Sequence, residues 1–482
     1  MKNIIEIKNG VARHPLHRMK TPINMTLCEG EHLAIVGPNA GGKTVLVDTI
    51  IGKYPLLMNE VIYDFSPSAS KSAFDNIKYI AFRDTYGDAD GSYYYQQRWN
   101  STDMDTTPVV KELLPETDDL ELRDRLYKLF HIVPMLEKHI ILLSSGELRK
   151  FQLTKTLLSN PRVLIMDNPF IGLDAQTRDL LRDLLKELTC LGYLQVIIVL
   201  SKTDNIPDFI THVISVDNMI CGDKMTREDY INAQKPIPSH VLTEEKRNRI
   251  ISLPYRNQEY DSPNVVELNK VSIRYGERTI LKDLDWTVKR GEMWALSGEN
   301  GCGKSTLISL ICADNPQSYA CDIALFGRKR GSGESIWDIK KHIGYVSPEM
   351  HRAYLKNLPT IDIVASGLND SIGLYKKPQK NQFEQCEWWM DIFGILDLKD
   401  RSFLELSSGE QRLALLARAF IKDPELLILD EPLHGLDLMN RRMVKDVIEA
   451  FCSRKNKTMI MVTHYKEELP MVINHSLTLV RN

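Results

Sequence analysis

Two glycine-rich segments hold the residues best suited to binding phosphate. Residues 37–44 and 298–305 both read GxxxxGK followed by Thr or Ser. In such a loop, backbone N–H groups surround the phosphates, the lysine reaches the outer ones and the hydroxyl binds magnesium. A glycine-rich turn with a surface lysine is the alternative, which the second copy weakens. The candidate ligands for ATP are Gly37, Asn39, Gly41, Gly42, Lys43 and Thr44, and then Gly298, Asn300, Gly301, Gly303, Lys304, Ser305 and Thr306.

Acidic residues follow short apolar runs further along the chain. Asp167 and Asp430 each end such a run. This position fits the aspartate that orients Mg²⁺ in phosphoryl-transfer sites. Glu431 comes next and can orient or deprotonate an attacking water. His464 follows the apolar run 459–462 and can hold that water against the γ-phosphate, although a buried structural histidine is the alternative. The predicted catalytic residues are Glu431, His464 and Lys304, and the predicted magnesium ligands are Thr44, Asp167, Ser305 and Asp430.

The two copies differ at the positions that would perform hydrolysis. Asn168 stands where the second copy has Glu431, and an amide cannot accept a proton from water at neutral pH. We align Lys202 with His464, and a lysine is a poor substitute for a fixed imidazole. We therefore expect the first copy to bind ATP and to turn it over slowly or not at all.

The adenine side shows a similar asymmetry. Tyr275 lies 23 residues before the second glycine-rich segment and is suited to stack on a base. A strand tyrosine without a ligand is the alternative. His14, at the same distance before the first segment, is a weaker platform.

The motifs recur because the chain repeats a whole domain. They occur twice in the same order, with 124 residues from lysine to aspartate in the first copy and 126 in the second. We place one domain over 1–235, a linker over 236–263 with a short helix within 242–253, and a second domain over 264–482. Short apolar runs alternate with amphipathic segments, which predicts an α/β fold with a covered parallel sheet.

Composition excludes several other classes of protein. Lys and Arg number 61 against 64 Asp and Glu, so the basic excess of a nucleic-acid-binding protein is missing. A local basic stretch, 328–330 and 340–342, is suited to an acidic partner or is solvated surface. No apolar run approaches the ~18–20 residues that span a bilayer, no secretory signal is visible, and the eight cysteines lack CxxC spacing. We therefore expect a cytoplasmic protein.

The segments LSSGE at 143–147 and 406–410, together with the phosphate loops and the run 430–437, resemble the ATP-binding-cassette (ABC) superfamily. The resemblance implies two tandem ABC-type P-loop NTPase domains, each with a mainly parallel sheet core, a helical subdomain and an antiparallel β edge. It also implies head-to-tail pairing, with each ATP between one phosphate loop and the signature of the other domain. The signature candidates are Ser144, Ser145 and Gly146, and Ser407, Ser408 and Gly409.

The run 325–347 is similar to the second cassette of the bacterial ModF family, molybdate-transport ATP-binding proteins also called photorepair protein PhrA. That resemblance implies an ATPase that energises molybdate transport through separate permease subunits at the cytoplasmic face of the inner membrane. Transporter cassettes carry a glutamine after Gly-Tyr-Val, where this chain has Glu349 as a candidate replacement and magnesium contact; the first copy has Arg83 and Asp84. A soluble tandem ATPase acting on a ribosome, nucleic acid or protein, and a nucleotide sensor with negligible turnover, are the alternatives.

Overall fold

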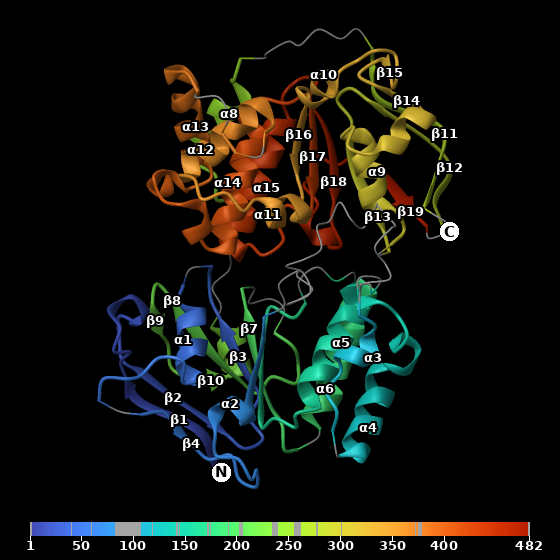
Figure 1. Cartoon of the computed structure of the whole chain (residues 1–482). Helices are drawn as coiled ribbons and strands as arrows, with labels where there is room; N and C mark the ends of the chain where they lie inside the picture. Colours follow the sequence, from blue (N-terminus) through green and yellow to red (C-terminus); the bar gives the residue numbers. More distant parts are fainter. Residues whose placement is uncertain are drawn as a thin grey trace. The chain divides into compact units, whose positions relative to one another are not determined.

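The chain divides into two compact units, Met1–Pro236 and Ile237–Asn482 (Figure 1). The structure is a computed structural model. It describes residues 2–39, 41–58, 60–81, 108–117, 119–140, 143, 145–170, 173, 175–190, 192–201, 206–233, 240–254, 262–275, 278–299, 301–371, 373–374 and 378–480. Each unit is described by itself below.

The second unit is built on a five-stranded parallel sheet. Its strand order is β16 (Ile343–Val346), β17 (Leu426–Asp430), β18 (Thr458–Val462), β13 (Met293–Gly298) and β19 (His475–Leu479). Every residue of β17 and β18 is buried, as expected of parallel strands covered on both faces. The carboxyl ends of these strands lie at one edge of the sheet, so the residues that follow them are brought together.

Side-chain alternation along these strands builds two cores. Leu426 and Ile428 pack with α9 (Lys304–Ile311), whereas Leu427 and Leu429 pack with α14 (Ser408–Phe420) and α15 (Leu438–Cys452). Figure 1 shows α9 on the side of the sheet nearer β11 and β12, and α14 and α15 on the other side. The same alternation divides the core of the first unit.

Further elements of the second unit complete the two layers. An antiparallel sheet has the order β12 (Arg278–Lys289), β11 (Asn264–Tyr275), β14 (Asp322–Leu325) and β15 (Arg328–Lys329). A helical region contains α10 (Ile336–Lys340), α11 (Pro348–Ala353), α12 (Thr360–Ala365) and α13 (Lys380–Ile392). Its core contains an aromatic cluster, in which Trp389, Phe393, Phe420 and Phe451 pack against one another with ring centroids 4.9–6.3 Å apart.

The first unit repeats this strand order. Its parallel strands run β8 (His212–Asp217), β3 (Leu33–Val36), β7 (Gln195–Leu200), β6 (Val163–Asp167) and β5 (Ile77–Ala81), with β9 (Ile220–Cys221) and β10 (Met225–Thr226) beside β8. An antiparallel sheet follows the order β2 (Ile23–Cys28), β1 (Asn3–Gly10) and β4 (Ile62–Tyr63). The helices are α1 (Lys43–Ile50), α2 (Ala73–Asn76), α3 (Val110–Leu113), α4 (Leu120–Phe130), α5 (Ser145–Leu157), α6 (Ala175–Thr189) and α7 (Arg227–Asn232). The predicted α/β fold with two repeated domains is confirmed.

Part of the segment predicted to be a linker packs on the second unit. Helix α8 (Glu244–Ile251) lies against α15, and its residue Ile250 is fully buried there. Just before it, the backbone N–H groups of Val241 and Leu242 donate to the carboxylate of Asp446 on α15 at 2.7 and 3.1 Å. Residues 240–254 therefore form part of the second unit's surface layer.

Replacing Asp446 by Ala is expected to loosen this layer. The change leaves two buried N–H groups without their acceptor, at a cost of about 1–3 kcal/mol. Amide hydrogen exchange over 242–253 should then become faster. As a control, Asp391→Ala removes a partly exposed ion pair with Lys246, which is worth about 0–1 kcal/mol. Equal exchange rates over 242–253 in the two variants would contradict the prediction that Asp446 holds this layer in place.

Candidate active sites in the two units

The second phosphate loop joins β13 to α9 and its glycines cannot be replaced without moving their neighbours. Gly298 and Gly303 have φ of +146° and +103°. A Cβ at Gly298 would lie 2.5 Å from the carbonyl oxygen of Leu479. The Lys304 ammonium donates to the carbonyl oxygens of Gly298 and Glu299 at 2.7 and 2.9 Å, so the lysine folds over the loop. The loop thus has the tight turn and, in the partly buried Lys304, the cation that a phosphate chain requires.

The first phosphate loop has the same form. Gly42 has φ of +107° and precedes α1, and a Cβ at Gly37 would lie 1.8 Å from the carbonyl oxygen of Val216. The Lys43 ammonium donates to the carbonyl oxygens of Gly37 and Pro38 at 2.8 and 2.6 Å. Gly41 is buried behind the loop, and Asn39 is half-buried.

The hydroxyl residues that follow the two lysines are both exposed. Thr44 and Ser305 lie in the first turns of α1 and α9, and Thr306 beside Ser305 is buried. An exposed hydroxyl at this place is accessible to Mg²⁺. Gly301 lies in the second loop with φ of +79°, whereas Asn300 lies outside the described residues.

Two predicted catalytic residues, Glu431 and His464, and the predicted magnesium ligand Asp430 meet at the carboxyl ends of β17 and β18. Asp430 ends β17, Glu431 follows it, and the His464 backbone N–H donates to the Glu431 carboxylate at 3.1 Å. The His464 ring nitrogen Nε2 lies 3.7 Å from the same carboxylate oxygen. Strand β13, which leads into the loop that holds Lys304, is the next neighbour of β18. The structure therefore brings two carboxylates and an imidazole to the edge of the sheet where the phosphate loop begins.

Burial, together with the neighbouring carboxylates of Asp430 and Glu468, raises the pKa of Glu431 to about 8. The Glu431 side chain is among the buried acidic residues. A divalent cation bound at Asp430 would favour the ionised form of its neighbour. A carboxylate with a pKa near the working pH suits a general base.

Glu431→Gln is expected to stabilise the second unit in metal-free and nucleotide-free buffer above pH 5. With a folded-state pKa of about 8 against 4.5 unfolded, Glu431 holds its proton more tightly in the folded state, so stability falls as pH rises between these values. Gln removes that loss, up to about 4 kcal/mol at pH 8. Thermal unfolding followed by tryptophan fluorescence should show a higher Tm for the variant at pH 8 and nearly equal values at pH 4. A lower Tm at pH 8 would contradict the raised pKa.

The first unit has an amide in the corresponding place. Asn168 has φ of +50°, close to the +49° of Glu431, so the backbone at this position is alike in both units. Its side-chain N–H donates to the Asp167 carboxylate at 2.8 Å, and the hydroxyl of Tyr79 donates to the other oxygen at 3.1 Å. The site can therefore hold Asp167 in position for a cation but has no general base at Asn168.

The alignment of Lys202 with His464 is wrong. Strand register pairs Asp167 with Val199 and Asp430 with Val462, so Ser201 takes the position of His464. The Ser201 N–H donates to the Asn168 side chain at 3.3 Å, as the His464 N–H does to Glu431. Lys202 itself lies outside the described residues. The sequence did hold a signal for this register, because Pro207 and Pro470 each follow their aspartate by 40 residues.

The second signature segment forms the start of α14. Ser407 caps the helix by accepting from the Glu410 N–H at 3.4 Å, and the Glu410 carboxylate accepts from the Ser407 N–H at 2.7 Å. Ser408 is exposed and Gly409 is buried. The remaining backbone N–H groups at a helix start are suited to binding an anion. In the first unit, α5 begins at Ser145, and its second residue is Gly146. Ser144 lies outside the described residues, and the exposure of Ser145 and Gly146 is not described.

The two adenine-side candidates have partners of their own. The Tyr275 hydroxyl accepts from the Asn315 side chain at 3.0 Å, and Asn315 lies just beyond the carboxyl end of α9. His14 is exposed, with its ring 5.2 Å from that of His17. Stacking on adenine stays a prediction for both. Glu349 lies in the first turn of α11, its side chain is not described, and its role also stays a prediction.

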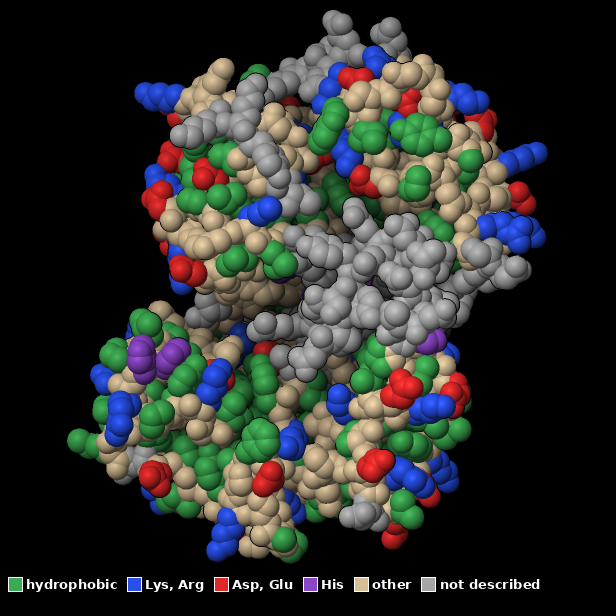
Figure 2. All heavy atoms as spheres, in the orientation of Figure 1, with side chains coloured by type: hydrophobic (Ala, Val, Ile, Leu, Met, Phe, Trp, Pro, Cys, Tyr) green, Lys and Arg blue, Asp and Glu red, His purple; other side chains and the backbone are tan. Residues whose placement is uncertain are grey.

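The basic stretch in the second unit is largely neutralised by the chain's own acids. The buried guanidinium of Arg330 pairs with Glu334 at 2.5 Å, and the ammonium of Lys340 pairs with Asp314 at 2.5 Å. Lys329 pairs with Asp322. Figure 2 shows Lys and Arg interspersed with Asp and Glu on the face in view. This arrangement favours the solvated-surface interpretation over a surface for an acidic partner.

Two glycine-rich phosphate loops on parallel sheets, each with an aspartate at the end of another strand of the same sheet, define a tandem P-loop nucleotide-binding protein. The ABC transporter family model matches residues 21–171 and 281–434, so the chain belongs to the ABC family of ATP-binding proteins. The tandem arrangement predicted from the repeat is thus confirmed, and ATP with Mg²⁺ is the ligand of the family's domains in general.

Two full-length relatives share the tandem arrangement. The chain is 36% identical over 473 residues to the ABC transporter ATP-binding protein ModF of Escherichia coli, covering 95% of this chain and 92% of that protein. It is 29% identical to an uncharacterized ABC transporter ATP-binding protein of Schizosaccharomyces pombe, covering 96% and 94%. The predicted resemblance to ModF is confirmed.

Solved structures support the fold alone. An archaeal ribosome recycling factor, aABCE1, in complex with a ribosomal stalk protein matches with a TM-score of 0.56 and 19% identity, covering 98% of this chain and 87% of that one. A structure described as RNase-L inhibitor matches with the same score, covering 93% and 83%. Among the described residues, no helix has the length and apolar character needed to cross a membrane.

Proposed function

We propose that the second unit hydrolyses ATP with Glu431 as the base that orients and deprotonates the attacking water. The single observation that supports this most is the meeting of Glu431 with the His464 N–H beside Asp430. Lys304 would neutralise the outer phosphates, and Ser305 and Asp430 would hold Mg²⁺, which supplies charge neutralisation of the transferred phosphoryl group.

The first unit would hold ATP as a structural ligand. Lys43, Thr44 and Asp167 retain the phosphate and magnesium functions, whereas Asn168 and Ser201 provide neither a base nor an imidazole. Each ATP would be completed by the signature of the other unit, so Ser407 and its neighbours would close on the nucleotide of the first unit. ATP affinity measured for Lys43→Ala and Lys304→Ala separately should reveal one site lost in each variant.

The partner we propose is a membrane permease for an oxyanion, molybdate in the first instance. This rests on the similarity to a protein described as ABC transporter ATP-binding protein ModF. A soluble, non-transport partner is the second candidate, favoured by one observation. The residues after the Gly-Tyr-Val strand are Ser347, Pro348 and Glu349, without the glutamine of transporter cassettes.

Affinity co-purification separates the two candidates. Glu431→Gln protein with ATP present should keep the closed state and retain any partner that prefers it. The membrane and soluble fractions of the native cell are analysed separately, with Lys43→Ala/Lys304→Ala protein as the control that cannot close. Recovery of an oxyanion permease with the first protein alone supports transport. Recovery of ribosomes, nucleic acid or a soluble protein without a permease overturns it.

A further inference from the structure

A buried arginine joins the signature helix to the catalytic glutamate. Arg412 lies four residues after the start of α14 and is 5% exposed. Its guanidinium Nη1 donates to the carbonyl oxygen of Glu431 at 2.6 Å. A buried guanidinium requires hydrogen-bond acceptors, and one acceptor of Arg412 is this backbone carbonyl of the active site.

The carbonyl that Arg412 contacts belongs to an uncommon backbone conformation. Glu431 has φ of +49°, a left-handed conformation that residues with a Cβ seldom adopt. Its N–H donates to the Val462 carbonyl at 2.9 Å, and its own carbonyl also accepts from the His434 N–H at 3.1 Å. Hydrogen bonds on both sides of the residue fix the direction in which its carboxylate leaves the backbone, toward the His464 N–H.

The helix that carries Arg412 begins with the second signature. Ser407 caps α14, and Arg412 lies little more than one helical turn further along the same helix. The signature segment and the Glu431 carbonyl are therefore linked through one helix and one side chain.

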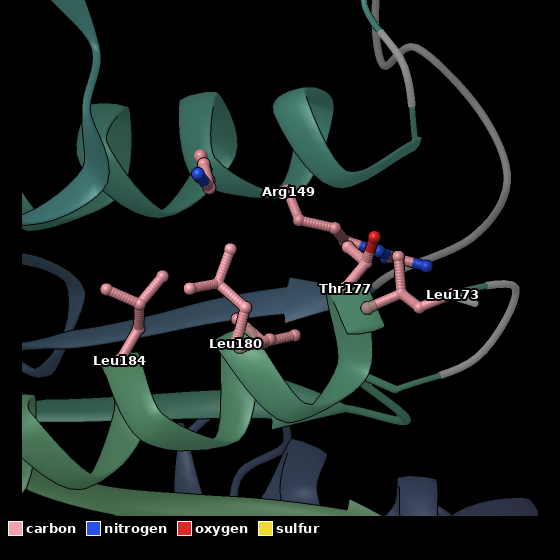
Figure 3. A pocket seen from close by; sticks show the side chains of 7 residues that line it. Arg149, Leu173, Thr177, Leu180 and Leu184 are labelled. Atoms are coloured by element: carbon pink, nitrogen blue, oxygen red, sulfur yellow. The ribbon is translucent and has the colours of Figure 1, made fainter. Parts of the chain in front are cut away.

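The corresponding arginine of the first unit is Arg149 on α5. It lines a small pocket between α5 and α6 and extends beside Leu173 and Thr177 (Figure 3). The residue after the magnesium aspartate there is Asn168, which cannot act as a base. The helix-to-glutamate link therefore has chemical consequences in the second unit.

We propose that Arg412 is a positioning residue, which holds Glu431 in the orientation for catalysis through the Glu431 carbonyl. The inference rests on the proposed function, because Glu431 is the base of that reaction.

Steady-state kinetics of the full chain test the positioning. Arg412→Gln is expected to lower kcat about tenfold with the KM for ATP within about twofold, because phosphate binding by Lys304 is unchanged. Arg412→Lys retains a donor and should recover most of kcat. Arg418→Gln is the matched control, a buried arginine of the same helix bound to Ser366 and Asp370, and should lower Tm without changing kcat per folded molecule. Equal losses of kcat in Arg412→Gln and Arg418→Gln, or a rise in KM with kcat unchanged, would overturn the proposal.

Failure of the proposed function can be distinguished from failure of this inference, because it would appear as undiminished hydrolysis by Glu431→Gln.

Discussion

Glu431→Gln is expected to lower steady-state ATP hydrolysis by about 10²–10⁴-fold, the range that general-base assistance usually provides. Gln has nearly the same shape and keeps an oxygen for the His464 N–H, so the variant should remain folded. An amide cannot take a proton from water, which removes the base and leaves Lys304 and Asp430 in place. ATP binding should therefore stay close to that of the wild-type protein.

Phosphate release and nucleotide binding together check this expectation. Glu467→Gln is a matched control, because Glu467 is an exposed acid three residues after His464 and its loss should leave the rate unchanged. A rate for Glu431→Gln near that of the wild-type protein would remove Glu431 from the mechanism. A loss of ATP binding along with hydrolysis would show that the glutamate acts on binding and not on the chemical step.

A second large effect is expected from rebuilding the first site. In the Glu431→Gln background, where the second site is inactive, Asn168→Glu combined with Ser201→His should raise hydrolysis at least about tenfold. The backbone at Asn168 already has the left-handed φ found at Glu431, and Asp167 lies beside it. Strand register places Ser201 where the second unit has its histidine. Asn168→Glu alone should raise the rate less than the pair.

The matched control distinguishes the two alignments of the first site. Asn168→Glu combined with Lys202→His places the imidazole one residue further along and should give no gain over Asn168→Glu alone. Phosphate release at saturating ATP is the measurement for all three variants. A larger gain with Lys202→His than with Ser201→His would refute the register. An unchanged rate in every variant would show that the first unit lacks more than these two side chains.

The phosphate loops, the two aspartates and the repeat could be predicted from the sequence because each depends on residues close together in the chain. A strand, a GxxxxGK loop and a helix form one local unit, and motifs that recur in the same order identify two similar domains. The substitution of Asn168 for Glu431 was visible for the same reason, since both follow their aspartate directly.

The position of Ser201 required the sheet. The strand β7 reaches the active edge by pairing with β6, and only that pairing determines which residue lies beside Asn168. A shift of one residue in a strand places the neighbouring side chain on the opposite face. Counting along an apolar run without its partner strand leaves that shift open, so the sequence alone does not distinguish Lys202 from Ser201.

Tertiary structure alone also decided the surroundings of Glu431 and the neutralisation of the basic stretch. The pKa of Glu431 is raised because residues far apart in sequence exclude water from it and place Glu468 nearby. Arg412 on α14 donates to the carbonyl oxygen of Glu431. Glu334 and Asp314 form ion pairs with Arg330 and Lys340 of the basic stretch. By itself the sequence determined which groups the protein possesses, because the order of residues is local information. Which of those groups meet, and how strongly water is excluded from them, was decided by the folded chain, because burial and ion pairing depend on contacts between distant segments.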